Sequence, residues 1–266
     1  RNTLRFLLGA LDGFTKEEMV EEMFEDPSVL PELEQLVLHQ LTEMDKKVRG
    51  YIEDYDFMKL TKALHDFCNE ELSAFYFDIR KDRLYCDNPE SFKRRATRSV
   101  MATIYNGLVT WLAPVLSFTA EEAWSHRPEG VFGDEESIHL REFPDVPACW
   151  NNPALAGKWF ALRDLRKSVL EAIEPLRADK TIGSSLEALP VITVDENMAK
   201  AIEGQSLPDV FITSQVKVEQ GSETAVKIEK APGAKCIRCW KVLPEVFENG
   251  DICNRCAAVV NQKKAA

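Results

Sequence analysis

The chain has 266 residues, of which 45% are hydrophobic and 29% are charged, a balance typical of globular domains and not of disordered chains. This length exceeds what one hydrophobic core usually serves, so we expect two or three folding units. No stretch approaches the roughly eighteen apolar residues that a membrane span requires, and the first residues show no signal-peptide pattern. We therefore expect a cytoplasmic protein with no membrane partner.

The net charge of -11 argues against a wholly basic protein that wraps nucleic acid. The charge is uneven, because residues 1–234 carry 27 basic and 41 acidic side chains, whereas residues 235–266 carry 6 basic and 3 acidic ones. An acidic body with local basic clusters is compatible with a protein that contacts a polyanion at defined places. It is equally compatible with one that never does.

The first residues already show the pattern of an amphipathic helix, with no helix-start signal ahead of Arg1. We expect the chain to be a piece of a longer protein. Apolar residues then recur at three- and four-residue steps over 33–52 and again over 57–79, which predicts two long helices. A third helix is expected over 91–111, with Asn88 as its N-cap and Pro89 at its first position.

Two capping boxes predict further short helices, one beginning at Thr15 with Glu18 and one beginning at Thr119 with Glu122. Four or five helices joined by short connections favour an antiparallel bundle over residues 1–127. The fold class predicted for the whole chain is therefore mainly α. It consists of this bundle, a small α+β unit and a four-cysteine module.

Residues 128–150 contain prolines and glycines at intervals that interrupt any helix, so they are interpreted as a connector lying on the bundle. Residues 151–232 follow as a small α+β junction domain, which starts with a helix near Asn152. Its β-branched runs predict strands over 189–194, 210–218 and 225–228, with a short helix over 196–202.

The last part, residues 233–266, contains two Cys-x-x-Cys pairs: Cys236 with Cys239 and Cys253 with Cys256. Two such turns can present four thiolates to a tetrahedral Zn²⁺ at about 2.3 Å. Four thiolates leave no open coordination position, so one structural zinc ion is predicted. A segment this short has little apolar surface, and metal ligation would supply on the order of 10 kcal/mol of folding free energy.

A redox Cys-x-x-Cys motif is the competing interpretation of these cysteines. A redox enzyme needs only one pair, usually at the start of a helix in a thioredoxin-like fold, and the surrounding sequence does not indicate that fold. Trp240 follows the first pair directly. It either packs over the metal turn or forms a stacking platform for a base, flanked by cations such as Arg238. The sequence leaves these two alternatives open.

Two basic clusters flank the turn near residue 87: Arg80, Lys81 and Arg83 before it, and Lys93, Arg94, Arg95 and Arg98 after it. A solvated helix face is the default interpretation, and an RNA-facing patch is the alternative. No phosphate loop, dinucleotide fingerprint, zinc-protease motif or nucleophile elbow occurs in the chain. We therefore expect no catalytic residues.

Several motifs together resemble isoleucyl-tRNA synthetases of the bacterial type, and the resemblance covers essentially the whole chain. The joint of residues 112–124, LAPVLSFTAEEAW, is similar to one shared by the isoleucine, valine, leucine and methionine enzymes. The two Cys-x-x-Cys turns, here called knuckles, have the sequences Cys-x-Arg-Cys-Trp and Cys-x-Arg-Cys-Ala. They resemble the C-terminal zinc finger of the isoleucyl enzymes in particular. The remaining matches are RNTLRFLLG at 1–9, ELSAFY at 71–76, KDRLYCD at 81–87 and the KxIGxSL pattern at 180–186.

The resemblance implies the C-terminal, tRNA-binding portion of a class I enzyme that joins isoleucine to its tRNA using ATP. The family's catalytic signatures and proofreading domain are absent from this chain, so we expect ATP to be used only by the intact enzyme. We also expect the protein to be a monomer. The resemblance makes Cys236, Cys239, Cys253 and Cys256 the zinc ligands. It makes Trp240 and Arg238 RNA contacts, with Arg5, Arg80, Lys81, Arg83 and Arg94 as weaker ones.

Two alternatives to this interpretation stay open. One is the same region of a valyl or leucyl relative, which the isoleucyl type of the finger disfavours. The other is a zinc-stapled scaffold that docks protein rather than RNA.

Overall fold

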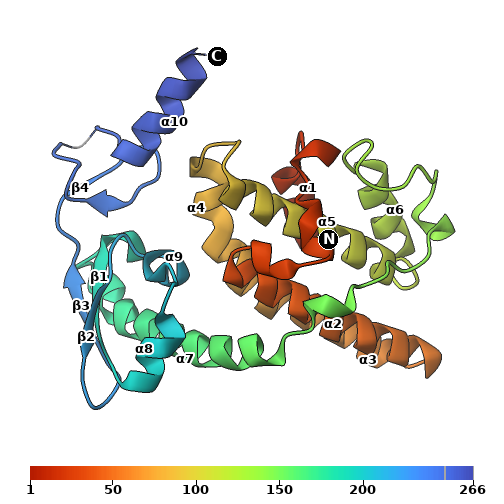
Figure 1. Ribbon diagram of the computed structural model, residues 1–266, viewed down its shortest axis with the longest axis horizontal. Helices are drawn as coiled ribbons and strands as arrows, with labels where there is room; N and C mark the ends of the chain where they lie inside the picture. The colour runs from red at the N-terminus through yellow and green to blue at the C-terminus, as the bar shows by residue number, and fades with distance from the viewer. Residues whose placement is uncertain (249, 266) are drawn as a thin grey trace. The chain divides into compact units, whose positions relative to one another are not determined.

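The computed structural model describes residues 1–248 and 250–265, with side chains in the final helix described as far as Asn261. The chain divides into two compact units (Figure 1): residues 1–80 with 89–153, and residues 81–88 with 154–266. Within the described part, no helix combines the length and apolar character needed to cross a membrane. The four-part division expected from the sequence stays a prediction.

The first unit is built from helices, as predicted. Its apolar stripes face inward, so that side chains of α5 such as Val100, Ile104 and Leu108 are fully buried. The helices are α1 (Asn2–Ala10), α2 (Glu32–Glu53), α3 (Phe57–Asp66), the π-helical η4 (Phe67–Phe77), α4 (Asp78–Cys86), α5 (Phe92–Leu112) and α6 (Ser117–Ser125). Only the first three residues of α4 belong to this unit, because residues 81–88 belong to the second. The single helix expected over 57–79 therefore changes winding, and the Ser73 hydroxyl donates to the carbonyl of Cys68, five residues earlier, at 2.7 Å.

Both capping boxes were wrong as caps, although the short helix predicted through Trp124 is present as part of α6. Thr15 precedes only a short 3₁₀ turn, η1 (Lys16–Glu18), and Thr119 lies inside α6; neither Thr15 nor the residue before α6 forms a side-chain cap. The acidic members of the two boxes are bound elsewhere. Glu18 accepts from Arg98 at 2.7 Å and Glu122 accepts from Arg1 at 2.9 Å. Tertiary ion pairs have replaced the local bonds that the pattern predicted.

The start of α5 also differs from the prediction. Its N-cap is Ser91, whose hydroxyl accepts from the backbone N–H of Arg94 at 3.3 Å. Asn88 and Pro89 precede the helix. Ser and Asn are comparably good N-caps, and the chain uses the one that lies nearer the helix.

Residues 126–152 contain two short 3₁₀ turns, η5 (Ile138–Leu140) and η6 (Ala148–Trp150), and otherwise irregular backbone. This segment is fixed to the helices of its own unit. The indole of Trp150 is buried, and its N–H donates to the carbonyl of Met23 at 2.8 Å. The backbone N–H of Asn152 donates to Nδ1 of His39 at 3.0 Å.

The second unit begins with α7 (Pro153–Ala178) and a three-stranded sheet of order β2-β1-β3. Strand β1 (Ala188–Val194) pairs in parallel with β2 (Lys217–Gln220) and antiparallel with β3 (Ala225–Lys230). The parallel pair requires a crossover, which α8 (Glu196–Ile202) and α9 (Leu207–Phe211) provide. The strand predicted over 210–218 was wrong in its first half, where the chain forms the end of α9. Pro208 suits the first turn of this helix, and Val210 is buried on its inner side.

Candidate metal centre and nucleic-acid surface

Four cysteines converge at one point of the second unit. The hairpin of β4 (Ala234–Lys235) and β5 (Val242–Leu243) holds Cys236 and Cys239 in its turn. Cys253 and Cys256 lie at the start of α10 (Asn254–Ala265). All four are buried, and their Sγ atoms lie within 4.8 Å of one another.

The spacing of these sulfur atoms fits a tetrahedral metal. The Sγ atoms of Cys239 and Cys253 are 3.8 Å apart, and two sulfurs bound at about 2.3 Å to a tetrahedral zinc ion are separated by about 3.8 Å. All seven cysteines of the chain are free thiols, so no disulfide competes for these four. The donor set consists of soft sulfur atoms, which suits zinc.

Two of the sulfurs accept hydrogen bonds within the site, although burial raises the pKa of the Cys239 and Cys256 thiols. The backbone N–H of Cys253 donates to Sγ of Cys236 at 3.3 Å, and Nη1 of Arg238 donates to Sγ of Cys256 at 3.5 Å. Burial alone would raise the pKa of the Cys236 thiol, but hydrogen bonds from backbone N–H groups outweigh it and lower that pKa to about 6. A thiolate is the form of cysteine that binds a metal.

Few apolar side chains support this part of the fold. The buried cluster around the site consists of the four cysteines with Cys86 and Val246, and Ala234, Leu243 and Ile252 are packed against it only in part. Such a cluster removes little apolar area from water, so hydrophobic burial contributes little to its stability. The cysteines occupy the position that a hydrophobic core has in a larger domain.

The first knuckle ends at Trp240, whose backbone N–H donates to the carbonyl of Cys236 at 2.9 Å. Trp240 has a φ of 66°, in the left-handed region that a bulky side chain rarely adopts. Its side chain is 62% exposed. The ammonium group of Lys235 lies 5.6 Å from the centre of the indole ring, within the range of a cation–π contact.

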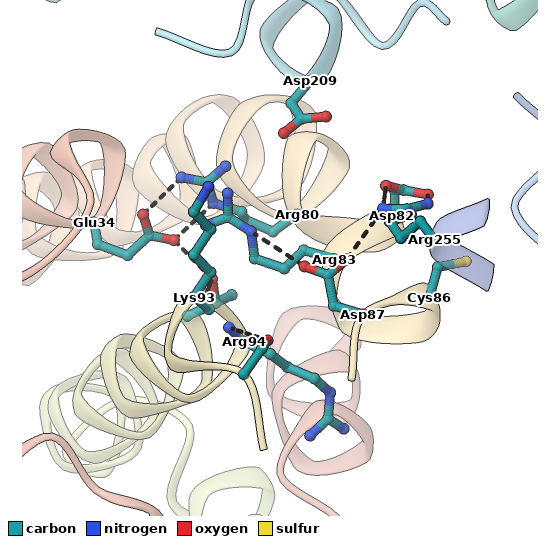
Figure 2. A network of polar contacts seen from close by, with 12 residues as sticks. Glu34, Arg80, Asp82, Arg83, Cys86, Asp87, Lys93, Arg94, Asp209 and Arg255 are labelled. Atoms are coloured by element: carbon teal, nitrogen blue, oxygen red, sulfur yellow. Dashed lines mark hydrogen bonds and ion pairs between the residues drawn. The ribbon is translucent and has the colours of Figure 1, made fainter. Parts of the chain in front are cut away.

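The second unit also includes the segment Lys81–Asn88, which contains the end of α4 and lies beside the metal site. Arg238 donates to the carbonyl of Cys86 at 2.6 Å and to that of Tyr85 at 3.2 Å. The guanidinium of Arg255 donates to both carboxylate oxygens of Asp82, at 2.6 and 2.8 Å (Figure 2). It also donates to one carboxylate oxygen of Asp87, at 3.1 Å.

Lys241 adds a third cation to this contact. Its ammonium group lies 3.1 Å from the carboxylate of Asp209 and 3.6 Å from that of Asp82. Burial alone would raise the pKa of Asp82, but the hydrogen bond from Arg255 and the charge of Lys241 outweigh it, so this pKa is lowered. Asp82 is therefore held as a carboxylate between two cations.

A family model described as the anticodon-binding domain of tRNA ligase matches residues 34–193. The chain belongs to this family. The match begins in the helical unit and extends through β1 of the second unit.

Curated relatives of this anticodon-binding chain are isoleucine–tRNA ligases. That of Gluconobacter oxydans is 46% identical over 98% of this chain and 27% of its own length. That of Agrobacterium fabrum is 45% identical over 100% of this chain and 28% of its own length. That of Zymomonas mobilis is 43% identical over 98% of this chain and 27% of its own length. The resemblance to isoleucyl-tRNA synthetases is thus confirmed, and the chain spans about a quarter of the length of these relatives.

The predicted RNA contacts are divided between the two units of the anticodon-binding chain. Arg5, Arg80 and Arg94 lie in the first unit. Lys81, Arg83, Arg238 and Trp240 lie in the second. Arg5, Lys81 and Trp240 are exposed, whereas Arg94 and Arg238 are half-buried.

Arg80 is only 5% exposed, and its guanidinium donates to both carboxylate oxygens of Glu34 at 2.6 and 2.7 Å (Figure 2). Its burial argues against the predicted RNA contact, because the guanidinium would have to leave a buried carboxylate to reach a phosphate. The side chain of Arg83 is 10% exposed and lies 4.0 Å from Asp87. Neither arginine presents its charge on the surface.

Sequence reasoning missed the acidic partners of these cations. Glu34 is fully buried between Arg80 and Thr97, whose hydroxyl donates to it at 2.8 Å. One signal was available, since Glu34 adjoins Leu33 at the start of the apolar stripe of α2. Asp82 and Asp87 carry no such signal, because nothing in the local pattern pairs them with a cation more than 160 residues away.

Proposed function

We propose that this chain is the C-terminal, tRNA-holding region of an isoleucine–tRNA ligase. It recognises the anticodon stem and loop of isoleucine tRNA, while ATP and isoleucine are used by parts of the intact enzyme that lie outside this chain. We further propose that the protein is cytoplasmic and monomeric. Membership in the anticodon-binding family and the similarity to isoleucine–tRNA ligases over 98% of the chain support this proposal.

One Zn²⁺ ion is proposed to bind Cys236, Cys239, Cys253 and Cys256. Four ligands complete its tetrahedron, so the ion has no open position and supplies folding free energy rather than chemistry. The buried sulfurs, with their spacing near the edge of a zinc–sulfur tetrahedron, support this assignment. The cysteines and their hydrogen bonds fix the turn on which Trp240 stands.

Trp240 carries the functional proposal. A bulky residue in the left-handed region costs on the order of 1–2 kcal/mol relative to glycine, and this side chain recovers little of that cost by burial. A tryptophan at such a position is explained by what its exposed ring contacts. Unstacked anticodon bases are recognised by stacking on aromatic rings, and each stacked base contributes about 1–3 kcal/mol.

Cations near the aromatic ring support a polyanionic partner. Lys235 lies over the indole, and the exposed Lys81 belongs to the same unit. In the other unit, Arg5 is exposed and Arg94 is half-buried. We propose these residues as phosphate contacts, which hold the tRNA without reading its sequence.

Replacing Trp240 tests this function with little risk to the fold. Trp240→Gly relieves the backbone strain, so this variant should keep one zinc ion per chain and full thermal stability. It should nevertheless bind isoleucine tRNA about 5- to 150-fold more weakly in a filter-binding titration, as expected for the loss of about 1–3 kcal/mol of stacking. Trp240→Phe is the matched control and should retain most of the affinity.

Unchanged binding by Trp240→Gly would contradict the role of the indole. Titration with valine and leucine tRNAs separates the isoleucine-specific proposal from a valyl or leucyl relative. Weak binding to every tRNA would indicate a scaffold that docks protein. The chain alone should not exchange pyrophosphate into ATP with isoleucine, and such exchange would place catalysis within it.

A further inference from the structure

The two knuckles share a feature that metal binding alone does not require. Each has the form Cys-x-Arg-Cys, so Arg238 and Arg255 both stand immediately before the second cysteine of their pair. Both side chains leave the knuckle and bind the segment Lys81–Asn88 of the same unit. This segment is separated from the knuckles by about 150 residues of chain, so the contact is formed only in the folded unit.

Arg238 binds the end of helix α4. The last carbonyls of a helix have no partner within it, and the guanidinium donates to those of Tyr85 and Cys86 at 3.2 and 2.6 Å. The contact is reciprocal, because the Cys86 thiol donates to the carbonyl of Arg238 at 3.9 Å. A cation at this end of a helix is also favoured by the helix dipole.

The same guanidinium reaches the metal site. Its Nη1 atom donates to Sγ of Cys256 at 3.5 Å, while the backbone of Arg238 is held between Cys236 and Cys239. One side chain therefore contacts a thiol of the second knuckle and the carbonyls of α4. Its position depends on both knuckles being closed.

Arg255 binds the side chains of the same segment. Its guanidinium forms two hydrogen bonds with the carboxylate of Asp82 and one, at 3.1 Å, with that of Asp87. A bidentate ion pair fixes the relative orientation of the two side chains as well as attracting them. Asp82, Asp87 and Asp209 lie around these cations, and the charge of Asp209 opposes ionisation of the other two carboxyls. Without Arg255, these carboxylates would repel one another more strongly, although Arg83 and Lys241 would still offset part of the repulsion.

From these contacts we infer that Arg238 and Arg255 are positioning residues that make the order of the segment Lys81–Asn88 depend on the closed four-cysteine site. When the knuckles are closed around a metal, the two arginines hold the end of α4. When the knuckles open, the helix end loses its cap and its ion pairs together. The inference rests on the proposed zinc site, and it deepens the proposed function because the segment carries the exposed side chains of Lys81 and Tyr85.

Hydrogen–deuterium exchange on the full chain tests this inference. With zinc bound, peptides covering residues 81–88 should be protected, and chelation should speed their exchange at least tenfold together with that of residues 236–256. Arg255→Met and Arg238→Met should each keep one zinc per chain while exposing residues 81–88 to the same degree. Arg177→Met is the control, since Arg177 is an exposed arginine of this unit whose guanidinium pairs with its neighbour Glu174.

Exchanging the charges of Asp82 and Arg255 distinguishes loss of their ion pair from general misfolding. Asp82→Arg alone should release the segment, and combining it with Arg255→Asp should restore part of the protection. Equal exchange of residues 81–88 with and without zinc would overturn the inference. Loss of zinc from both methionine variants would also overturn it, since the arginines would then be ordinary supports of the metal site. Failure of the wild-type chain to bind tRNA would contradict the proposed function and leave this result intact.

Discussion

The helical unit and the four-cysteine module are stabilised by different means. The helical unit has a large apolar interior in which Tyr105, Trp111 and Trp124 are almost completely buried, and the pair of Glu34 with Arg80 is buried in this unit as well. The module has four thiols at its centre and very few buried apolar side chains. Hydrophobic burial is the main stabilising term for the first region, whereas the second would depend on the proposed zinc ligation. The two regions should therefore respond to different perturbations.

Metal removal should have the largest effect, and this effect should be confined to the module and to the segment Lys81–Asn88 that its arginines bind. Structural zinc sites of this kind contribute on the order of 10 kcal/mol, so a chelator should unfold residues 234–256 while the helical unit keeps its stability. Cys236→Ser should do the same and reduce the zinc content from one ion per chain to none. Metal analysis with far-ultraviolet circular dichroism measures both. A module that stays folded without metal would remove the distinction between the regions.

Breaking the buried ion pair should have the next largest effect and should be confined to the helical unit. Glu34→Ala leaves the Arg80 guanidinium buried without its carboxylate, which costs about 3–5 kcal/mol. Urea denaturation of the zinc-loaded chain measures this loss. Replacing both residues with methionine should recover much of it, because an apolar pair suits an apolar interior.

An exposed pair provides the control for that experiment. Glu196 and Lys200 form an i,i+4 ion pair on the surface of α8, and Glu196→Ala should cost less than about 1 kcal/mol. A cost of that size for Glu34→Ala would show that the buried pair contributes no more than a surface pair.

A glycine at the entry to the module should give a smaller effect. Gly233 has a φ of 105°, and a Cβ atom there would lie 2.1 Å from the backbone carbonyl oxygen of Leu243. Gly233→Ala should therefore distort the β4–β5 hairpin, cost more than about 1–2 kcal/mol and weaken zinc affinity. Gly204→Ala is the matched control, because Gly204 also has a positive φ, of 76°, but open space around it. Thermal unfolding and competition with a zinc chelator measure the difference, and equal costs would contradict the steric argument.

Acid should produce the smallest effect, in the helical unit. Burial lowers the pKa of His39 below its ordinary value of about 6.5, and the neutral ring accepts from the backbone N–H of Asn152. The contribution of His39 to stability is complete above pH 6.5. It is lost as the pH falls through the lowered pKa of the folded state, because the unfolded chain binds the proton more readily.

His39→Asn removes this titration while keeping an acceptor near the position of Nδ1. As the pH falls below about 6.5, the free energy of unfolding of this variant should change less than that of the wild-type chain, in urea denaturation at a series of pH values. The same slope in both proteins would show that other groups cause the acid sensitivity.

Local patterns predicted most of the helices and the convergence of the four cysteines on one site. Helical periodicity and the Cys-x-x-Cys spacing are both properties of neighbouring residues. They failed where a distant partner took over a local role. Glu18 and Glu122 fit a capping box, yet each is bound by an arginine from another part of its unit. Arg80 and Arg238 fit a basic, RNA-facing surface, yet each binds an acceptor far away in the chain.

The sequence by itself determined the helical class of the fold and the chemistry of the cysteine site, because both follow from residue types at short, fixed intervals. Only the tertiary structure decided which cations are available to a partner. A charged side chain is long and can reach any acceptor that folding brings near it, so its role depends on contacts such as Arg80 with Glu34 and Arg255 with Asp82. The same holds for Trp240, because the sequence left its exposure open and only the structure shows its left-handed backbone and its exposed ring.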